Sequence, residues 1–104
     1  MYIKIYVKTL VEFNTETGII NYFRRMIHDL KERNLFDLVP HFVMAHGYME
    51  WYMLLDETFP SLSQKGPSEK EFQHFCDQLF CDNMLSINEQ TLLRRKGWEA
   101  YQNH

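Results

Sequence analysis

The chain has 104 residues, of which 45% are hydrophobic, 15% aromatic and 24% charged. This length predicts a single domain, residues 1–104, built around one hydrophobic core. The aromatic content argues against a disordered chain, and 4 glycines, 3 prolines and 2 cysteines argue against collagen-like, low-complexity and disulfide-rich proteins. The formal net charge of -3 disfavours bulk attraction to nucleic acid or to an anionic membrane surface.

Residues 2–13 alternate between apolar and polar side chains. The odd positions from Ile3 to Phe13 are mostly β-branched or aromatic, whereas the even positions include Lys4 and Lys8. This period of two predicts a strand with one buried face. A helix over the same residues stays open as an alternative, because apolar side chains also recur there at helical spacing.

The hydrophobic stretches of the chain are short and interrupted by charge. Lysines interleave the first apolar residues, unlike in a signal peptide, and no run of about 18 apolar residues is present to cross a membrane.

Cys76 and Cys81 fall on one predicted helix, where their spacing puts the Cα atoms about 7.5 Å apart, too far for a usual disulfide. We therefore expect reduced thiols, a cytoplasmic location and no membrane association.

A first helix is predicted from Ile19 to Asn34. Thr15 or Thr17 offers an N-cap before it, and Asn34 is a residue type that often ends a helix in the left-handed conformation. The predicted apolar stripe recurs every three or four residues, which is typical of a helix packed on a core. Its members are Ile19, Ile20, Phe23, Met26, Ile27 and Leu30.

A second helix is predicted from Pro40 to about Glu57, because proline suits the first helical turn. This segment is apolar on nearly every side, which indicates a helix buried all round or one that meets a partner. A hairpin turning at His46-Gly47 is the alternative for the same residues. Methionine and aromatic side chains are enriched at protein interfaces, so we expect a partner interface here. The expected interface residues are Tyr48, Met49, Trp51, Tyr52 and Met53.

The last third of the chain predicts a helix, a hairpin and a short terminal helix. Ser68 and Glu71 form a capping-box pattern that opens a helix ending near Asp82-Asn83. Residues 84–87 and 91–94 are predicted as two strands joined by a turn at 88–90, and residues 96–101 as the terminal helix. The expected fold class is α+β, with an N-terminal strand, three main helices, a C-terminal β-hairpin and a short terminal helix.

This part of the chain, from Pro67 to Tyr101, resembles the C-terminal part of winged-helix domains. The similarity rests on Phe72, Phe75 and Leu79 in the first helix, on a wing-like hairpin, and on the Lys-Gly-x-Glu-x-Tyr pattern at 96–101. The resemblance implies that the hairpin lies along a DNA backbone. The chain departs from the family pattern at Arg94-Arg95, where a Thr or Ser cap is usual, and at an acidic residue in the wing turn.

Several side chains are candidates for binding or chemistry. Five basic residues could contact phosphate: Arg94, Arg95, Lys96, Arg24 and Arg25. His46 and Glu50 share a helix face, but with His41 elsewhere they fall short of a zinc set. No phosphate loop, nucleophile elbow or spaced carboxylate pair occurs. We therefore expect no catalytic residue, no metal, no cofactor and no small-molecule substrate.

These observations together predict a small non-enzymatic regulatory or adaptor protein that acts by binding. In this hypothesis the Met- and aromatic-rich helix forms a homodimer or meets a protein partner, and the wing-like region touches DNA or protein. The alternative is a compact inhibitor, such as a toxin-immunity or phage counter-defence protein, that blocks one protein partner. That alternative predicts an exposed acidic patch made of Glu69, Glu71, Asp77 and Asp82.

Overall fold

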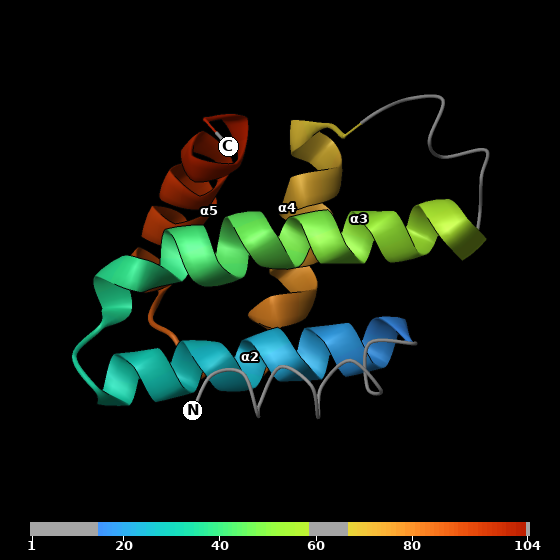
Figure 1. Ribbon diagram of the computed structural model, residues 1–104. Coiled ribbons are helices and arrows are strands. Elements are labelled where there is room, and N and C mark those ends of the chain that lie inside the picture. The colour runs from blue at the N-terminus through green and yellow to red at the C-terminus, as the bar shows by residue number, and fades with distance from the viewer. Residues whose placement is uncertain (1–14, 59–66, 104) are drawn as a thin grey trace.

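The computed structural model describes residues 15–58 and 67–103, and these residues form helices without any strand (Figure 1). The α-helices are α2 (Glu16–Glu32), α3 (His46–Thr58), α4 (Glu69–Leu79) and α5 (Ile87–Gln102). Between α2 and α3 lie a 3₁₀ helix, η2 (Phe36–Leu38), and a π-helix, η3 (Pro40–Ala45). The strand predicted over residues 2–13 lies outside the described residues.

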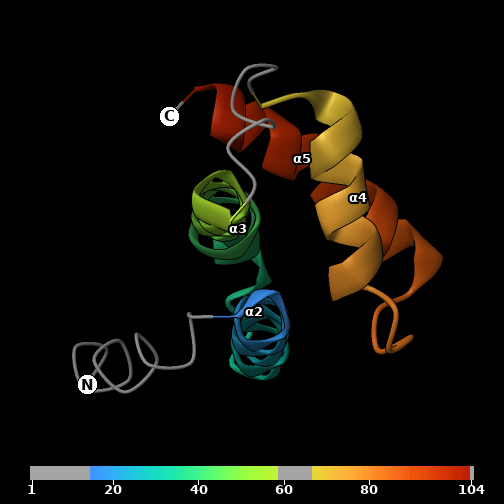
Figure 2. The ribbon, with the colours of Figure 1, turned by 90° about the vertical axis from the view of Figure 1, so that its right-hand side faces the viewer.

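The helices are arranged in two crossed layers. Helices α2 and α3 run antiparallel side by side, and α4 and α5 cross behind them at a steep angle (Figures 1 and 2). The core fills the space between the layers, where Phe23 of α2, Tyr48 of α3 and Phe72 of α4 are all 0% exposed. Each layer therefore supplies large aromatic side chains that the other layer covers.

The two helices predicted with N-cap residues begin where those caps are. The Thr15 hydroxyl accepts a hydrogen bond from the Gly18 backbone N–H at 2.9 Å, and α2 begins at the next residue. The Ser68 hydroxyl likewise accepts from the Glu71 N–H at 3.2 Å and opens α4. Such caps satisfy amide groups that the first helical turn leaves unpaired. Both helices are confirmed, and Asn34 follows α2 with a left-handed φ of 59°.

The helix predicted from Pro40 to about Glu57 is also confirmed, and the alternative hairpin at 46–47 is not formed. Its first part is π-helical, with Pro40 in the first turn, and its second part is α3. Gly47 lies inside the helix, where an added Cβ would lie 3.0 Å from the Phe23 ring. The glycine thus allows α2 to pack closely rather than introducing a turn.

The predicted C-terminal hairpin is wrong, and with it the α+β fold class. Residues 87–102 form the single helix α5, so neither the two strands nor a separate helix at 96–101 exists. The supposed turn is the first helical turn: the Ser86 hydroxyl accepts from the Glu89 N–H at 3.1 Å, and the Glu89 carboxylate accepts from the Ser86 N–H at 2.8 Å. This reciprocal capping box starts a helix where a wing was expected.

The buried face of α5 explains why its helical pattern is hard to see in the sequence. Its buried positions are Leu93, Gly97 and Ala100, which recur at helical spacing but include two very small residues. An added Cβ at Gly97 would lie 2.5 Å from the Met44 Cβ and 2.9 Å from the Phe72 Cζ. Helix α5 therefore packs directly against η3, and this close approach leaves no room for the large side chains that mark an apolar stripe.

Candidate functional site

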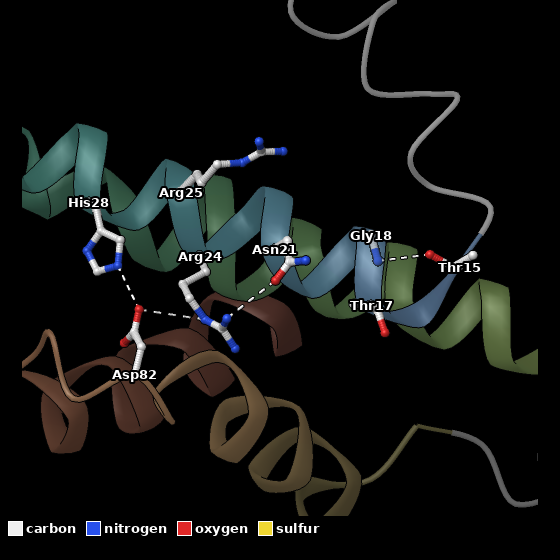
Figure 3. Close-up of a pocket in the computed structure, with 8 residues that line it drawn as sticks. All are labelled: Thr15, Thr17, Gly18, Asn21, Arg24, Arg25, His28 and Asp82. Atoms are coloured by element: carbon white, nitrogen blue, oxygen red, sulfur yellow. Dashed lines mark hydrogen bonds and ion pairs between the residues drawn. The ribbon is translucent and has the colours of Figure 1, made fainter.

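A polar groove of about 730 Å³ lies along α2 (Figure 3). One end is formed by the N-terminal turn of α2 and the other by the connection that follows α4. Its lining residues are Thr15, Thr17, Gly18, Asn21, Arg24, Arg25, His28 and Asp82. The groove is therefore lined by hydroxyl, amide and cationic groups with one carboxylate.

Arg24, at the floor of this groove, is used to cap the C-terminal end of α4. Its guanidinium donates to the backbone carbonyl oxygens of Gln78 at 2.6 Å and Leu79 at 3.3 Å, and one nitrogen lies 3.2 Å from the Cys81 Sγ. These carbonyls belong to the last helical turn, which has no intrahelical donors and carries the negative end of the helix dipole. Arg24 therefore joins α2 to α4 and keeps little capacity for a ligand.

Asp82 completes the junction between α2 and α4. Its Oδ2 atom lies 3.0 Å from His28 Nε2 and 3.7 Å from Arg24 Nε, and its Oδ1 accepts from the Met84 N–H at 3.2 Å. Figure 3 shows the three side chains converging, while Arg25 points away from Asp82. Partial burial raises the pKa of Asp82, but the hydrogen bonds from His28 and Met84 outweigh it, so the net pKa lies below the ordinary value.

The groove is best understood as a structural junction. Asp82 and Arg24, which line the groove, form an ion pair with each other. Arg24 also binds the C-terminal end of α4. Asn21, which also lines it, accepts a hydrogen bond from Arg24 at 3.4 Å. No nucleophile beside a general base lines this groove, and catalysis by such a pair would need both groups within hydrogen-bond reach.

Of the five basic residues proposed as nucleic-acid contacts, Arg24 and Arg94 bind groups of another helix, and the other three are exposed. Arg94 donates to the Gln73 side chain and to the Asp77 carboxylate, both at 2.6 Å, and its guanidinium lies 5.3 Å from the Phe80 ring centroid. It therefore fastens α5 to α4, as Arg24 fastens α2 to α4. Arg95 and Lys96 are exposed on α5, and Arg25 is exposed on α2.

The five residues predicted as a partner interface divide between core and surface. Tyr48 is 0% and Trp51 is 2% exposed, and their rings stack on each other with centroids 6.0 Å apart. Met49 and Tyr52 are half-buried, and Met53 alone among the five is 52% exposed. Burial inside the chain thus removes Tyr48 and Trp51 from any interface and makes them the centre of the aromatic core.

The histidine and cysteine side chains considered as metal ligands are dispersed. His46 Nε2 lies 3.7 Å from Glu50 Oε1, while His41 is exposed on η3. Both thiols are free, and burial raises the pKa of the Cys76 thiol to about 12, which keeps it protonated. Within residues 15–58 and 67–103, no three His, Cys, Asp or Glu side chains gather as a metal site would require.

An apolar surface patch lies on the connection between α2 and α3. Phe42 of η3 is 57% exposed, Leu35 is 40% exposed and Leu38 of η2 is 36% exposed. The neighbouring residues Val39, Pro40 and Val43 are buried, so the helical turns of this segment have a covered side and an open side. Asp37 and His41 share the open side. We call these five residues, Leu35, Asp37, Leu38, His41 and Phe42, the connection face.

The sequence contains a signal for this face that the prediction did not use. Leu35, Leu38 and Phe42 are spaced by three and four residues, which places side chains on one face of a helix. The signal was missed because the segment lies between two longer helices and because the methionine- and aromatic-rich stretch after it is much denser. The dense stretch, which is predicted as an interface, supplies the core residues Tyr48 and Trp51, and the smaller set marks the exposed patch.

The comparisons with known proteins add no relative. The chain matches no family model, no curated protein and no solved structure. Across the described part of the chain, none of the helices combines the length and the apolar character needed to cross a membrane.

Proposed function

We propose that this protein is a small non-enzymatic regulatory or adaptor protein, and that it acts by binding a protein through the connection face. The observation that carries the proposal is the exposure of Leu35, Leu38 and Phe42 on one side of the connection between α2 and α3. Contiguous exposed apolar side chains rimmed by polar groups are typical of protein interaction sites. Phe42 is the most exposed of the three, and aromatic side chains are enriched in the cores of protein interfaces.

The energy available from this face is moderate. Full burial of a leucine or phenylalanine contributes about 1.5–3 kcal/mol, so covering the exposed parts of these three contributes about 3 kcal/mol in total. Association itself costs at least about 4 kcal/mol in lost rigid-body freedom, so a partner must also make polar contacts. Asp37 and His41 lie on the same open side and can supply them. The face therefore supports a reversible rather than a permanent complex.

Protein binding is better supported than nucleic-acid binding or inhibition through an acidic patch. Arg24 and Arg94, two of the basic candidates, already bind groups on α4 or the loop after it. Two residues of the proposed acidic patch already have partners within the chain. Asp77 pairs with Arg94 at 2.6 Å, and Asp82 is held in the α2–α4 junction by His28. A cytoplasmic setting is part of the proposal, since a protein with an unpaired exposed thiol suits a reducing compartment.

Site-specific photo-crosslinking tests the proposal. A photoreactive phenylalanine analogue is placed at Phe42 in the full chain, expressed in the native host and irradiated, and the adducts are identified by mass spectrometry. The matched control carries the same analogue at Met53, which is 52% exposed on α3. We expect discrete protein adducts from position 42 that disappear with L38D. Equal adducts from both positions, or none from position 42, would overturn the proposal.

A further inference from the structure

We infer that the partner bound by the connection face is a second copy of this chain, packed antiparallel to the first. The inference deepens the proposed function and rests on it. A two-fold dimer uses the same surface on both copies, so every contact from residue i to residue j is repeated from j to i. The connection face meets this condition in its shape and in its charge.

The apolar side chains of the face are arranged so that two copies can pack on each other. Leu38 lies between Leu35 and Phe42 along the segment. An antiparallel copy whose two-fold axis crosses the segment between positions 38 and 39 therefore sets Leu35 against Phe42 in both directions and brings the two Leu38 side chains next to each other. The exposed fractions of these side chains, 40%, 36% and 57%, are then covered by side chains of the same kind.

The charged side chains of the face are self-complementary in the same arrangement. Asp37 and His41 are four residues apart on the open side, and neither side chain has a hydrogen bond or ion pair with another residue of the described chain. In an antiparallel pair, each carboxylate faces the imidazole of the other copy. A parallel pair would set like groups together, which destabilises a complex.

Neither the Asp37 nor the His41 side chain is paired with a charged group of α2, α3 or α5 in the described chain. On α2, Arg33 pairs with Asp29 at 3.2 Å. Lys31 pairs with Glu89 of α5 at 3.0 Å. On α3, the nearest histidine, His46, pairs with Glu50 at 3.7 Å. Glu32, also on α2, remains as an exposed carboxylate without such a pair in the described chain.

A second copy fits the face better than a partner of one charge sign. An acidic partner would oppose Asp37, and a basic partner would oppose a protonated His41. The antiparallel copy gives both groups an opposite partner at once. Because the apolar area is small compared with the roughly 800 Å² per partner of a stable complex, the dimer is weak and depends on concentration.

Sedimentation velocity measures this dimer directly. The full chain is studied from about 5 µM to 1 mM at pH 6 and pH 8, and its mass is compared with the monomer mass of 12.7 kDa. We expect a dimer with a dissociation constant between roughly 10 µM and 1 mM. A protonated imidazole attracts the Asp37 carboxylate of the other copy more strongly than a neutral one does, so the dimer should be tighter at the lower pH. A monomer at every concentration would overturn the inference.

Charge-changing variants test the antiparallel register. D37K sets its lysine against His41 of the other copy, and H41E sets its glutamate against Asp37 of the other copy. Each variant alone should dimerise roughly threefold to tenfold more weakly at pH 6. An equimolar mixture should restore association as a heterodimer, because both cross-contacts are then between opposite charges. Failure of the mixture to associate better than either variant would overturn the register.

A second set of variants separates this inference from the proposed function. F42D should weaken the dimer at least about tenfold, and M53D, at a similarly exposed position on α3, should leave it unchanged. Circular dichroism confirms that both variants fold. Adducts from the photoreactive analogue at Phe42 that join two copies support the dimer. Adducts only to a different protein would overturn the dimer and leave the proposed function standing.

Discussion

Phe42 and Tyr48 are six residues apart on one continuous helical segment, and they lie in opposite surroundings. Phe42 is 57% exposed, whereas Tyr48 is 0% exposed and contacts rings from α3, α4 and α5. The ring of Tyr101 lies 4.9 Å from that of Tyr48, and the ring of Phe72 lies 5.3 Å away. The difference comes from what packs on each ring: rings of α4 and α5 cover Tyr48, while the described residues leave more than half of Phe42 exposed.

The contrast teaches that the density of aromatic residues does not identify an interface in a chain of this size. A small domain needs its large side chains to fill one core, and the densest stretch supplies it. The large apolar side chains that face water are fewer, and among the described residues all but Met53 lie at or next to a connection between helices. Mutations in the methionine- and aromatic-rich helix α3 should therefore cause the largest losses in the free energy of unfolding. Mutations in the connection face should mainly weaken binding.

Truncating each aromatic ring gives the largest expected difference between the two regions. Y48A removes a fully buried ring, and its hydroxyl loses the 3.3 Å hydrogen bond to the Ser68 carbonyl. We expect a loss of about 3–5 kcal/mol in the free energy of unfolding, from lost burial and the cavity left behind. F42A should cost less than about 1 kcal/mol. Urea unfolding followed by circular dichroism measures both, and similar losses would contradict the assigned burial.

The close approach of α5 to η3 is the reason why Tyr48 is covered, and G97A tests it. The added methyl group would lie 2.5 Å from the Met44 Cβ, an atom next to the backbone that cannot move aside freely. We expect a loss of about 1–3 kcal/mol in the free energy of unfolding. G47A is the matched control, because its Cβ meets ring atoms of Phe23 and Phe75 at 3.0 and 3.1 Å. Both variants gain about 1 kcal/mol of helix propensity, which should offset most of the milder crowding at position 47 but not the 2.5 Å contact at position 97.

Thermal unfolding in the same buffer compares the two glycine variants. A G97A protein as stable as the wild type would show that α5 does not pack against η3 as closely as described. A G47A protein less stable than G97A would reverse the predicted order and point to the α2–α3 contact as the tighter one.

Much of the fold could be predicted from the sequence because caps and large apolar stripes are local signals. Thr15, one of the two predicted N-cap candidates, and Ser68 lie where α2 and α4 begin, and Asn34 lies just after the end of α2. The helix after Pro40 followed from its length and its apolar character. These features depend on neighbouring residues, so the sequence contains them directly.

The parts that could not be predicted depend on contacts between distant segments. The buried face of α5 contains Gly97 and Ala100, which are too small to mark an apolar stripe in the sequence. The sequence therefore predicts a hairpin over residues 84–94. Arg24 and Arg94 are candidates for phosphate in the sequence because no sequence pattern shows that they bind groups 17 to 58 residues away. Burial of Tyr48 and Trp51 has the same origin, since the covering helices come from elsewhere in the chain.

The cap of α5 is the local feature that decides between helix and hairpin, and S86A measures its strength. The variant removes the hydroxyl that accepts from the Glu89 N–H at 3.1 Å. We expect a loss of about 1 kcal/mol in the free energy of unfolding. S86D keeps an acceptor and adds a negative charge at the helix start, so it should recover most of the stability. Equal losses in S86A and S86D would show that the cap does not stabilise α5.

The smallest expected effect concerns the α2–α4 junction, and it appears in the pH dependence of stability. Burial raises the pKa of Asp82, but the hydrogen bonds from His28 and Met84 lower it by more. The pKa in the folded chain is therefore below its ordinary value. The ionised carboxylate therefore stabilises the folded chain above its unfolded pKa of about 3.9, and this contribution is lost as pH falls through the lower native pKa. D82N should be less stable than the wild type at pH 7, and the difference should shrink below about pH 4.

Urea unfolding at pH 7, 5, 4 and 3 follows this difference, with D37N as the matched control on the connection face. Asp37 has no hydrogen bond or ion pair within the described part of the chain, so D37N should differ little from the wild type at pH 7. If D82N and D37N gave the same difference at pH 7, the contacts of Asp82 with His28 and Arg24 would not stabilise the fold. If only D82N lost stability, Asp82 would stabilise the fold as Tyr48 does. Asp37, like Phe42, would then be free to contact a partner.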